Sequence, residues 1–172
     1  EAGLVDESWN SGPERGIVTD SVVVLVVREG NPKKISGWDD LARNGVGIVT
    51  PNPGSSGAAR GNILGAWQHV IAAGGSPADA EAFLAKVLGN VKAFPGSGRD
   101  ATQAFASGTG DVLISYENEA ILARQNGEKI DYVVPDDTLL IENPVAVLKD
   151  ADPKATAFLD FARSADGQAI YA

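Results

Sequence analysis

The chain has 172 residues and contains no cysteine, no methionine and only one histidine, His69. The absence of cysteine excludes disulfide bonds, thiol chemistry and cysteine-ligated metal sites. A single histidine leaves no convincing transition-metal site and no Ser-His catalytic triad. We therefore expect no metal, no cofactor and a structural or solvated role for His69. Because the chain lacks methionine, residue 1 is not a translation start, and we expect a processed, trimmed or partial chain.

Long apolar runs and basic clusters are also missing. The longest apolar run, Val22–Val27, has six residues, far fewer than the roughly 20 that a membrane-spanning helix needs, and it is typical of a buried strand. The net charge of −9 argues against nucleic acid or an acidic membrane surface as a partner. Hydrophobic residues make up 44% of the chain, which is enough to form a real core.

Predicted strands alternate with predicted helices along most of the chain. The patterns predict strands at 17–28, 46–49, 91–94, 111–115, 129–134 and 138–141, and helices at 37–42, 57–73, 77–88, 99–107, 117–125, 153–163 and 167–172. This alternation indicates an α/β fold with a parallel-rich sheet flanked by helices. In open sheets of this kind, ligands bind at the carboxyl ends of the strands.

The segment Thr50–Arg60 is the most informative part of the sequence. A buried-looking strand enters a Pro/Gly/Ser turn, which then opens a long helical pattern near Gly57. The first backbone N–H groups of a helix have no partner within it, and the helix dipole places positive charge there. With Ser55, Ser56, Gly57 and Ala58 at this junction, the sequence predicts a site for a small oxyanion, although an ordinary strand-to-helix turn also fits. The spacing matches neither a Walker A loop nor a nucleophile elbow.

Two further strand-end segments add candidate contacts. The Gly98 N–H is expected to donate to the same anion, while Arg99 stiffens its loop or lies behind the site. The neighbouring Asp100 would repel a dianion or accept the proton of a protonated oxyanion such as phosphate. Tyr116 follows the predicted strand 111–115 and is either a phenol donor that closes the pocket or a core or rim residue.

Thr50–Arg60 (TPNPGSSGAAR) closely resembles the signature of sulfate/thiosulfate-binding proteins, which are extracytoplasmic solute-binding components of ABC importers. The family version reads Asn-Pro-Lys-(Ser/Thr)-Ser-Gly-x-Ala-Arg, and Gly54 replaces its Lys here. Similar family blocks continue through most of the chain, at VLVVREGNPK (24–33), SGRDAT (97–102), GDVLISYENEA (110–120), IENPVAV (141–147) and SADGQAIYA (164–172).

The resemblance implies a two-lobed, type II periplasmic-binding-protein fold that closes around a dehydrated sulfate held by neutral donors. By position it implies that Ser55, Ser56, Gly57, Ala58, Gly98 and Tyr116 bind the anion, with Arg60, Arg99 and Asp100 behind them. Tyr116 stands where the family commonly has Trp, and Asp100 where it usually has a small residue. Both departures bear on which oxyanion is preferred.

The resemblance also implies a domain organisation and partners. Residues 1–28 would be a remnant of lobe I with a hinge strand, 29–136 the anion-binding lobe II, and 137–172 the hinge return and C-terminal part of lobe I. Family members carry further residues on both sides, so we expect a fragment, and our hypothesis is that a second copy replaces its missing partner, for example by swapping. The implied partners are sulfate or a related oxyanion and the membrane permease and ATPase of an ABC importer, in a periplasmic or other extracytoplasmic location.

Three alternatives remain open from the sequence. One is a related binding protein for molybdate, tungstate or phosphate, and another is the effector-sensing domain of a transcription regulator. The third is an enzyme with Ser55 or Ser56 as nucleophile, which lacks a placed base. The carboxylate pairs at 39–40 and 136–137 fit a helix start and a loop rather than a catalytic pair. We therefore expect a binding protein and not an enzyme.

Overall fold

The computed structural model describes residues 3–171, and the chain divides into two compact units. Unit 1 is formed by Glu1–Asp20 and Ile141–Ala172, and unit 2 by Ser21–Leu140. Within residues 3–171, no helix has the length and apolar character needed to cross a membrane.

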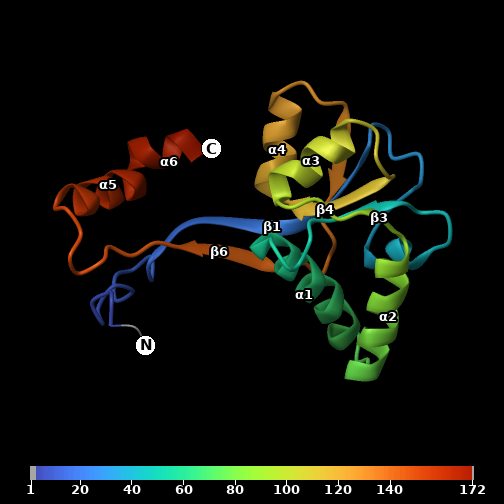
Figure 1. The fold of residues 1–172 in the computed structure, drawn as a ribbon, viewed down its shortest axis with the longest axis horizontal. Helices are drawn as coiled ribbons and strands as arrows, with labels where there is room; N and C mark the ends of the chain where they lie inside the picture. Colours follow the sequence, from blue (N-terminus) through green and yellow to red (C-terminus); the bar gives the residue numbers. More distant parts are fainter. Residues whose placement is uncertain (1–2, 172) are drawn as a thin grey trace. The chain divides into compact units, whose positions relative to one another are not determined.

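A mixed five-stranded path forms the centre of unit 2 (Figure 1). In spatial order it contains β3 (Val91–Ala93), β2 (Ile48–Val49), β4 (Val112–Tyr116), β1 (Ile17–Arg28) and β5 (Ile130–Val133). β2 pairs in parallel with both β3 and β4, whereas β1 is antiparallel to β4 and to β5. The predicted α/β fold is confirmed, with the antiparallel β1 making the sheet mixed.

β1 is buried because it has a strand on each side and helices over both faces of the sheet. Val23–Val27 are at most 1% exposed, and alternate side chains point to opposite faces. Val24 and Val26 belong to the core cluster beneath α3 and α4, together with Val49, Ala101, Phe105, Leu113, Ala120, Ala123 and Ile130.

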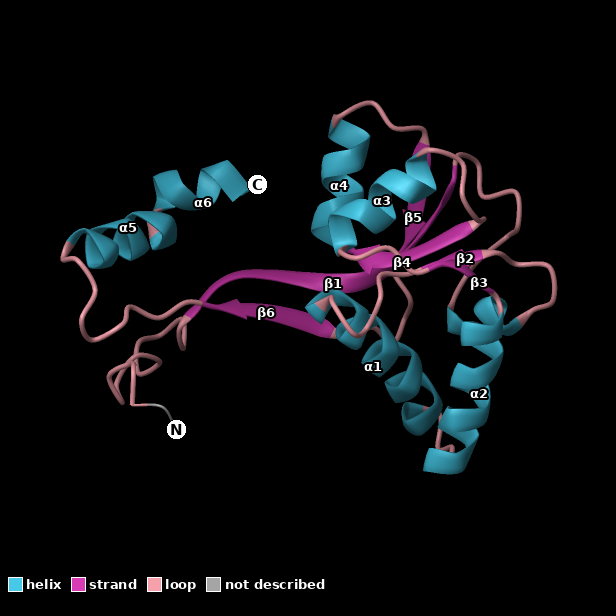
Figure 2. Ribbon diagram, in the orientation of Figure 1, coloured by secondary structure: helices cyan, strands magenta, loops and turns pink. Residues whose placement is uncertain are grey.

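The helices cover the two faces of this sheet in pairs (Figure 2). α1 (Gly57–Ala72) packs on α2 (Pro77–Gly89) over one face, and α3 (Gly98–Ala106) and α4 (Glu117–Gln125) cover the other. A short 3-10 helix, η1 (Trp38–Ala42), precedes β2. These elements confirm the predicted helices of this region to within a residue or two.

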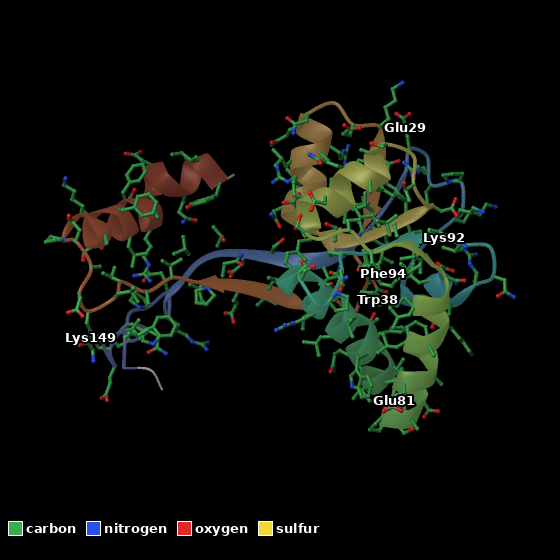
Figure 3. The ribbon with its side chains drawn as sticks, viewed as in Figure 1. Glu29, Trp38, Glu81, Lys92, Phe94 and Lys149 are labelled. Carbon is green, nitrogen blue, oxygen red and sulfur yellow. The ribbon has the colours of Figure 1, made fainter. Side chains whose placement is uncertain are left out.

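Trp38 anchors α1 against η1 (Figure 3). Its side chain is 1% exposed, and its indole N–H donates to the carbonyl of Asp137 at 3.0 Å. A Cβ atom placed on Gly65 of α1 would come within 3.0 Å of the indole ring. Glycine at this position therefore permits the close approach of α1 to Trp38.

Unit 1 contains all but the first residue of β6 (Leu140–Pro144), together with α5 (Lys154–Arg163) and α6 (Ala165–Tyr171). The strand predicted at 138–141 lies slightly later in the chain, at Leu140–Pro144. Its last residue is Pro144, and proline is tolerated on an edge strand. The amide of Asn143 donates to the carbonyl of Thr19 at 3.2 Å.

Candidate functional site

Parallel pairing brings three strand ends to one edge of the unit 2 sheet. β3, β2 and β4 run in the same direction, and α3, α1 and α4 begin after them. The N-termini of these helices consequently gather at the carboxyl edge of the sheet, where open α/β sheets bind ligands. All the predicted site residues lie in the three strand-to-helix junctions or in the first turns that follow them.

Asn52 organises the first junction, and the sequence reasoning did not single it out. Its carbonyl accepts from the N–H of Ser56 at 2.9 Å, and its side-chain oxygen accepts from the N–H of Gly54 at 2.8 Å. Its own N–H donates to the carbonyl of Pro95 at 2.7 Å in the neighbouring junction. An Asn that bonds the backbone two residues ahead is a recognisable turn signal, so this role could have been predicted.

Ser55 and Ser56 have different partners. The Ser55 hydroxyl donates to the carbonyl of Gly96 at 2.8 Å, so Ser55 ties the first junction to the second. Ser56 is the N-cap of α1 in an extended conformation, and its hydroxyl makes no capping hydrogen bond. The start of α1 therefore keeps the Ser56 hydroxyl and the N–H groups of Gly57 and Ala58 as donors without a capping partner.

The second junction places the start of α3 beside the start of α1. A Cβ atom placed on Gly98, the first residue of α3, would lie 3.7 Å from the Cβ of Ala58. Ser97 caps α3 by accepting from the N–H of Asp100 at 3.1 Å. The exposed Asp100 carboxylate lies toward Gly96, since its Oδ2 is 3.6 Å from where a Cβ of Gly96 would stand.

Tyr116 supplies the third junction, at the end of β4 and the N-cap of α4. Its hydroxyl donates to the carbonyl of Ala58 at 3.4 Å, which is a long bond. Burial raises the pKa of the phenol above its ordinary value, so Tyr116 remains a protonated donor at neutral pH. The side chain thus reaches from β4 to the first turn of α1.

Arg99 joins two helix starts. Its guanidinium forms a double hydrogen bond with Glu119, with Nε at 2.9 Å and Nη2 at 3.0 Å from the two carboxylate oxygens. The bond to Glu119 raises the pKa of Arg99, and the pair connects the first turns of α3 and α4. Arg60 is exposed in the first turn of α1. The residues at the starts of α1, α3 and α4, which are Ser56, Gly57, Gly98 and Tyr116, offer neutral hydroxyl and backbone donors.

Three helix starts gathered at the carboxyl edge of a mixed sheet are typical of a receptor for a small ligand. Comparison with known sequences places the chain in such a class. The model of the family described as bacterial extracellular solute-binding protein matches residues 1–172, so the chain belongs to that family. This match confirms the predicted solute-binding family and its extracytoplasmic location.

Individual relatives carry more specific names. A sulfate-binding protein of Synechococcus elongatus is 44% identical over 179 residues, covering 100% of this chain and 51% of the relative. A thiosulfate-binding protein of Pseudomonas aeruginosa is 37% identical over 180 residues, covering 99% of this chain and 54% of the relative. The chain spans about half the length of these curated relatives.

A solved structure supports the fold in the same way. The sulfate-binding protein SubI from Mycobacterium tuberculosis has a TM-score of 0.91 and 43% sequence identity, covering 99% of this chain and 60% of that chain.

Proposed function

We propose that this chain forms part of a receptor for a tetrahedral oxyanion, most simply sulfate, bound at the starts of α1 and α3. The proposed ligand donors are the Ser56 hydroxyl, the N–H groups of Gly57, Ala58 and Gly98, and the Tyr116 hydroxyl. Ser55 acts by holding the first junction against Gly96. The observation that carries the proposal is the parallel pairing of β2 with β3 and β4, which gathers these groups at one sheet edge.

Neutral donors at helix starts suit a dianion that has lost its water. Removing sulfate from water is unfavourable unless each oxygen receives replacement hydrogen bonds. Helix N-termini supply such bonds together with a favourable dipole. Sulfate carries no proton at neutral pH, so a site without an acceptor favours it over phosphate, whose proton would remain unpaired.

The relatives support a biological role for the whole protein. Proteins 44% and 37% identical to this chain are named sulfate-binding and thiosulfate-binding, and the family is extracellular. We propose that the whole protein captures the anion outside the cytoplasm, closes two lobes around it and presents it to an ABC permease and ATPase. In this proposal residues 29–136 form lobe II, and 1–28 with 137–172 contribute hinge strands and part of lobe I.

A protonated oxyanion such as phosphate is the second candidate, because Asp100 lies in the first turn of α3 beside Gly96. A carboxylate there offers an acceptor for the proton of the ligand. Calorimetric titration of the chain with sulfate, thiosulfate, molybdate and phosphate separates the two. We expect heat of binding with sulfate. If the chain instead binds phosphate, and Asp100→Asn abolishes that binding, then phosphate and not sulfate is the ligand.

The variant Ser56→Ala tests the site itself. It removes one uncommitted hydroxyl donor, so sulfate affinity should fall at least tenfold, since one hydrogen bond to a charged ligand is worth roughly 1.5–3 kcal/mol. Ser107→Ala, at the far end of α3, is the matched control and should bind as the parent does. Equal affinities for all three proteins would contradict the proposed site.

We also propose that the chain by itself pairs with a second copy through unit 1. Large apolar side chains of α5 and α6 are exposed there, including Phe158 at 67% and Ile170 at 74%. These two helices pack on one another, and apolar surface left exposed on them favours association. A clean monomer by light scattering at high protein concentration would contradict this.

A further inference from the structure

Asn62 is a buried amide that the proposed anion site does not use. It lies in the second turn of α1 and is only 1% exposed. Its Nδ2 donates to the hydroxyl oxygen of Thr50 at 3.1 Å and to the carbonyl of Ile114 at 2.8 Å. One side chain of α1 therefore bonds both the residue that follows β2 and the middle residue of β4.

The two partners of Asn62 lie where the β2–β4 ladder stops. The last paired residues are Val49 and Leu113, and Thr50 and Ile114 are the next residue on each strand. Beyond that point the backbone no longer joins the two strands, and the Asn62 amide takes over the connection. Thr50 leads into the first junction, and Ile114 precedes Tyr116 by two residues.

The side-chain oxygen of Asn62 argues against a purely structural explanation. Within residues 3–171 it is buried and has no hydrogen-bond partner. The adjoining void is about 10 Å³ and is lined mainly by apolar side chains of α1 and α2, at the lower limit for one water molecule and short of the polar partners that water needs. An unpaired buried oxygen destabilises the fold. Asparagine is therefore an unfavourable choice at position 62 unless the two bonds donated by its Nδ2 have a further role.

We propose that Asn62 is a positioning residue for the anion site: its amide holds the end of β2 against the middle of β4, at the spacing at which the Ser56–Ala58 helix start and Tyr116 converge. This inference rests on the proposed function for its ligand, while the geometry it describes exists without ligand. Asn62 touches no anion in this scheme and acts through Thr50 and Ile114.

Asn62→Leu keeps the side-chain size and removes both donors. We expect sulfate affinity to fall at least tenfold. Val87→Ala is the matched control, because Val87 is buried in the wall of the same void but lies on α2, away from the strand ends. It should lose stability with unchanged affinity. The two variants are compared at equal loss of thermal stability. If Asn62→Leu then binds sulfate as tightly as Val87→Ala does, Asn62 has only a structural role and the proposal is wrong.

Thr50→Val provides a second, independent variant. It removes the hydroxyl that accepts from Asn62 while keeping the shape of the side chain. We expect a smaller loss of affinity than for Asn62→Leu, and no further loss when both substitutions are combined, since each removes the same link. Additive losses would contradict a shared link.

Amide hydrogen exchange separates this inference from the proposed function. In ligand-free protein, the N–H groups of Thr50, Asn52 and Ser56, which donate to the carbonyls of Ala93, Pro95 and Asn52, should exchange faster in Asn62→Leu than in Val87→Ala. Faster exchange without any sulfate binding in the parent chain would support the positioning role and contradict the sulfate assignment. Unchanged exchange at these three amides would overturn the positioning role itself.

Discussion

Individual side chains in unit 2 act over long sequence distances. Tyr116 is one example, because its hydroxyl crosses from β4 to the carbonyl of Ala58 in α1. Since that bond is long at 3.4 Å, it contributes little to stability and leaves the phenol available to a ligand.

We therefore expect Tyr116→Phe to weaken sulfate binding more than it weakens the fold. Loss of one donor to a charged ligand is worth roughly 1.5–3 kcal/mol, whereas the melting temperature should change little. Paired calorimetric titration and thermal unfolding measure both. A large fall in melting temperature with unchanged affinity would show that the hydroxyl serves the fold instead.

His69 joins α1 to two other segments. Its Nδ1 lies 2.5 Å from Asp137 Oδ2, and its Nε2 lies 3.2 Å from Asp39 Oδ1. The side chains of Asp40 and Asp136 line the same cavity. Burial alone would lower the pKa of His69, but the hydrogen bonds and charges of Asp137 and Asp39 outweigh it, and the pKa is raised.

A raised pKa means that protonation of His69 favours the folded state. Its contribution should be fully present below the ordinary histidine pKa of about 6.5 and should disappear as pH rises through the higher folded-state pKa. Asp39 is 87% exposed, so Asp137 should carry most of the effect. Chemical unfolding across that pH range should show that the free energy of unfolding falls in the parent protein and falls less in His69→Gln. If the free energy of unfolding changes equally with pH in both proteins, the pairing of His69 with Asp137 is contradicted.

At the scale of elements, local signals determine where the helices begin. α2 starts with a capping box, in which the Ser76 hydroxyl accepts from the N–H of Asp79 at 3.2 Å and the Asp79 carboxylate accepts from the N–H of Ser76 at 2.8 Å. Pro77 occupies the first turn, where its missing N–H has no cost.

Ser76→Ala should reduce the free energy of unfolding by about 1 kcal/mol through loss of this cap. Because α2 lies away from the three junctions, anion affinity should not change. Urea unfolding measures the first quantity and titration the second. Ser76→Asp is the control, since aspartate also caps and should retain most of the stability.

The Arg99–Glu119 pair connects two elements but is open to solvent on the arginine side, whose side chain is 56% exposed. An exposed ion pair is worth about 0–1 kcal/mol. Glu119→Gln should therefore destabilise the fold by less than about 1 kcal/mol, and the difference should shrink in roughly 1 M salt. A larger effect that persists at high salt would indicate that the pair is structurally essential.

At the scale of the whole molecule, the net charge of −9 opposes the approach of an anion. The proposed donors act at contact distance and are neutral, so salt should screen the long-range repulsion without weakening the contacts. We expect the association rate of sulfate to rise as ionic strength is increased with a non-binding salt. A steep fall in affinity with salt, measured by titration, would instead indicate a site that depends on positive side chains.

Much of the fold could be predicted because its signals are local. The valine-rich run at 22–27, the Ser76-Pro77 start and the strand-to-helix turn at 50–57 each specify an element within a few residues. The resemblance carried by TPNPGSSGAAR added the family, which the comparisons confirm. The roles of individual site residues remain predictions.

The tertiary structure alone decided what depends on distant partners. The antiparallel direction of β1 follows from its pairing with β4 and β5, and a run of apolar residues contains no information on direction. Asn62 meets Ile114 across 52 residues, and His69 meets Asp137 across 68. Such contacts depend on which elements pack together. The periodicity of one segment specifies which of its side chains are buried, but it contains no information on the distant side chains that contact them.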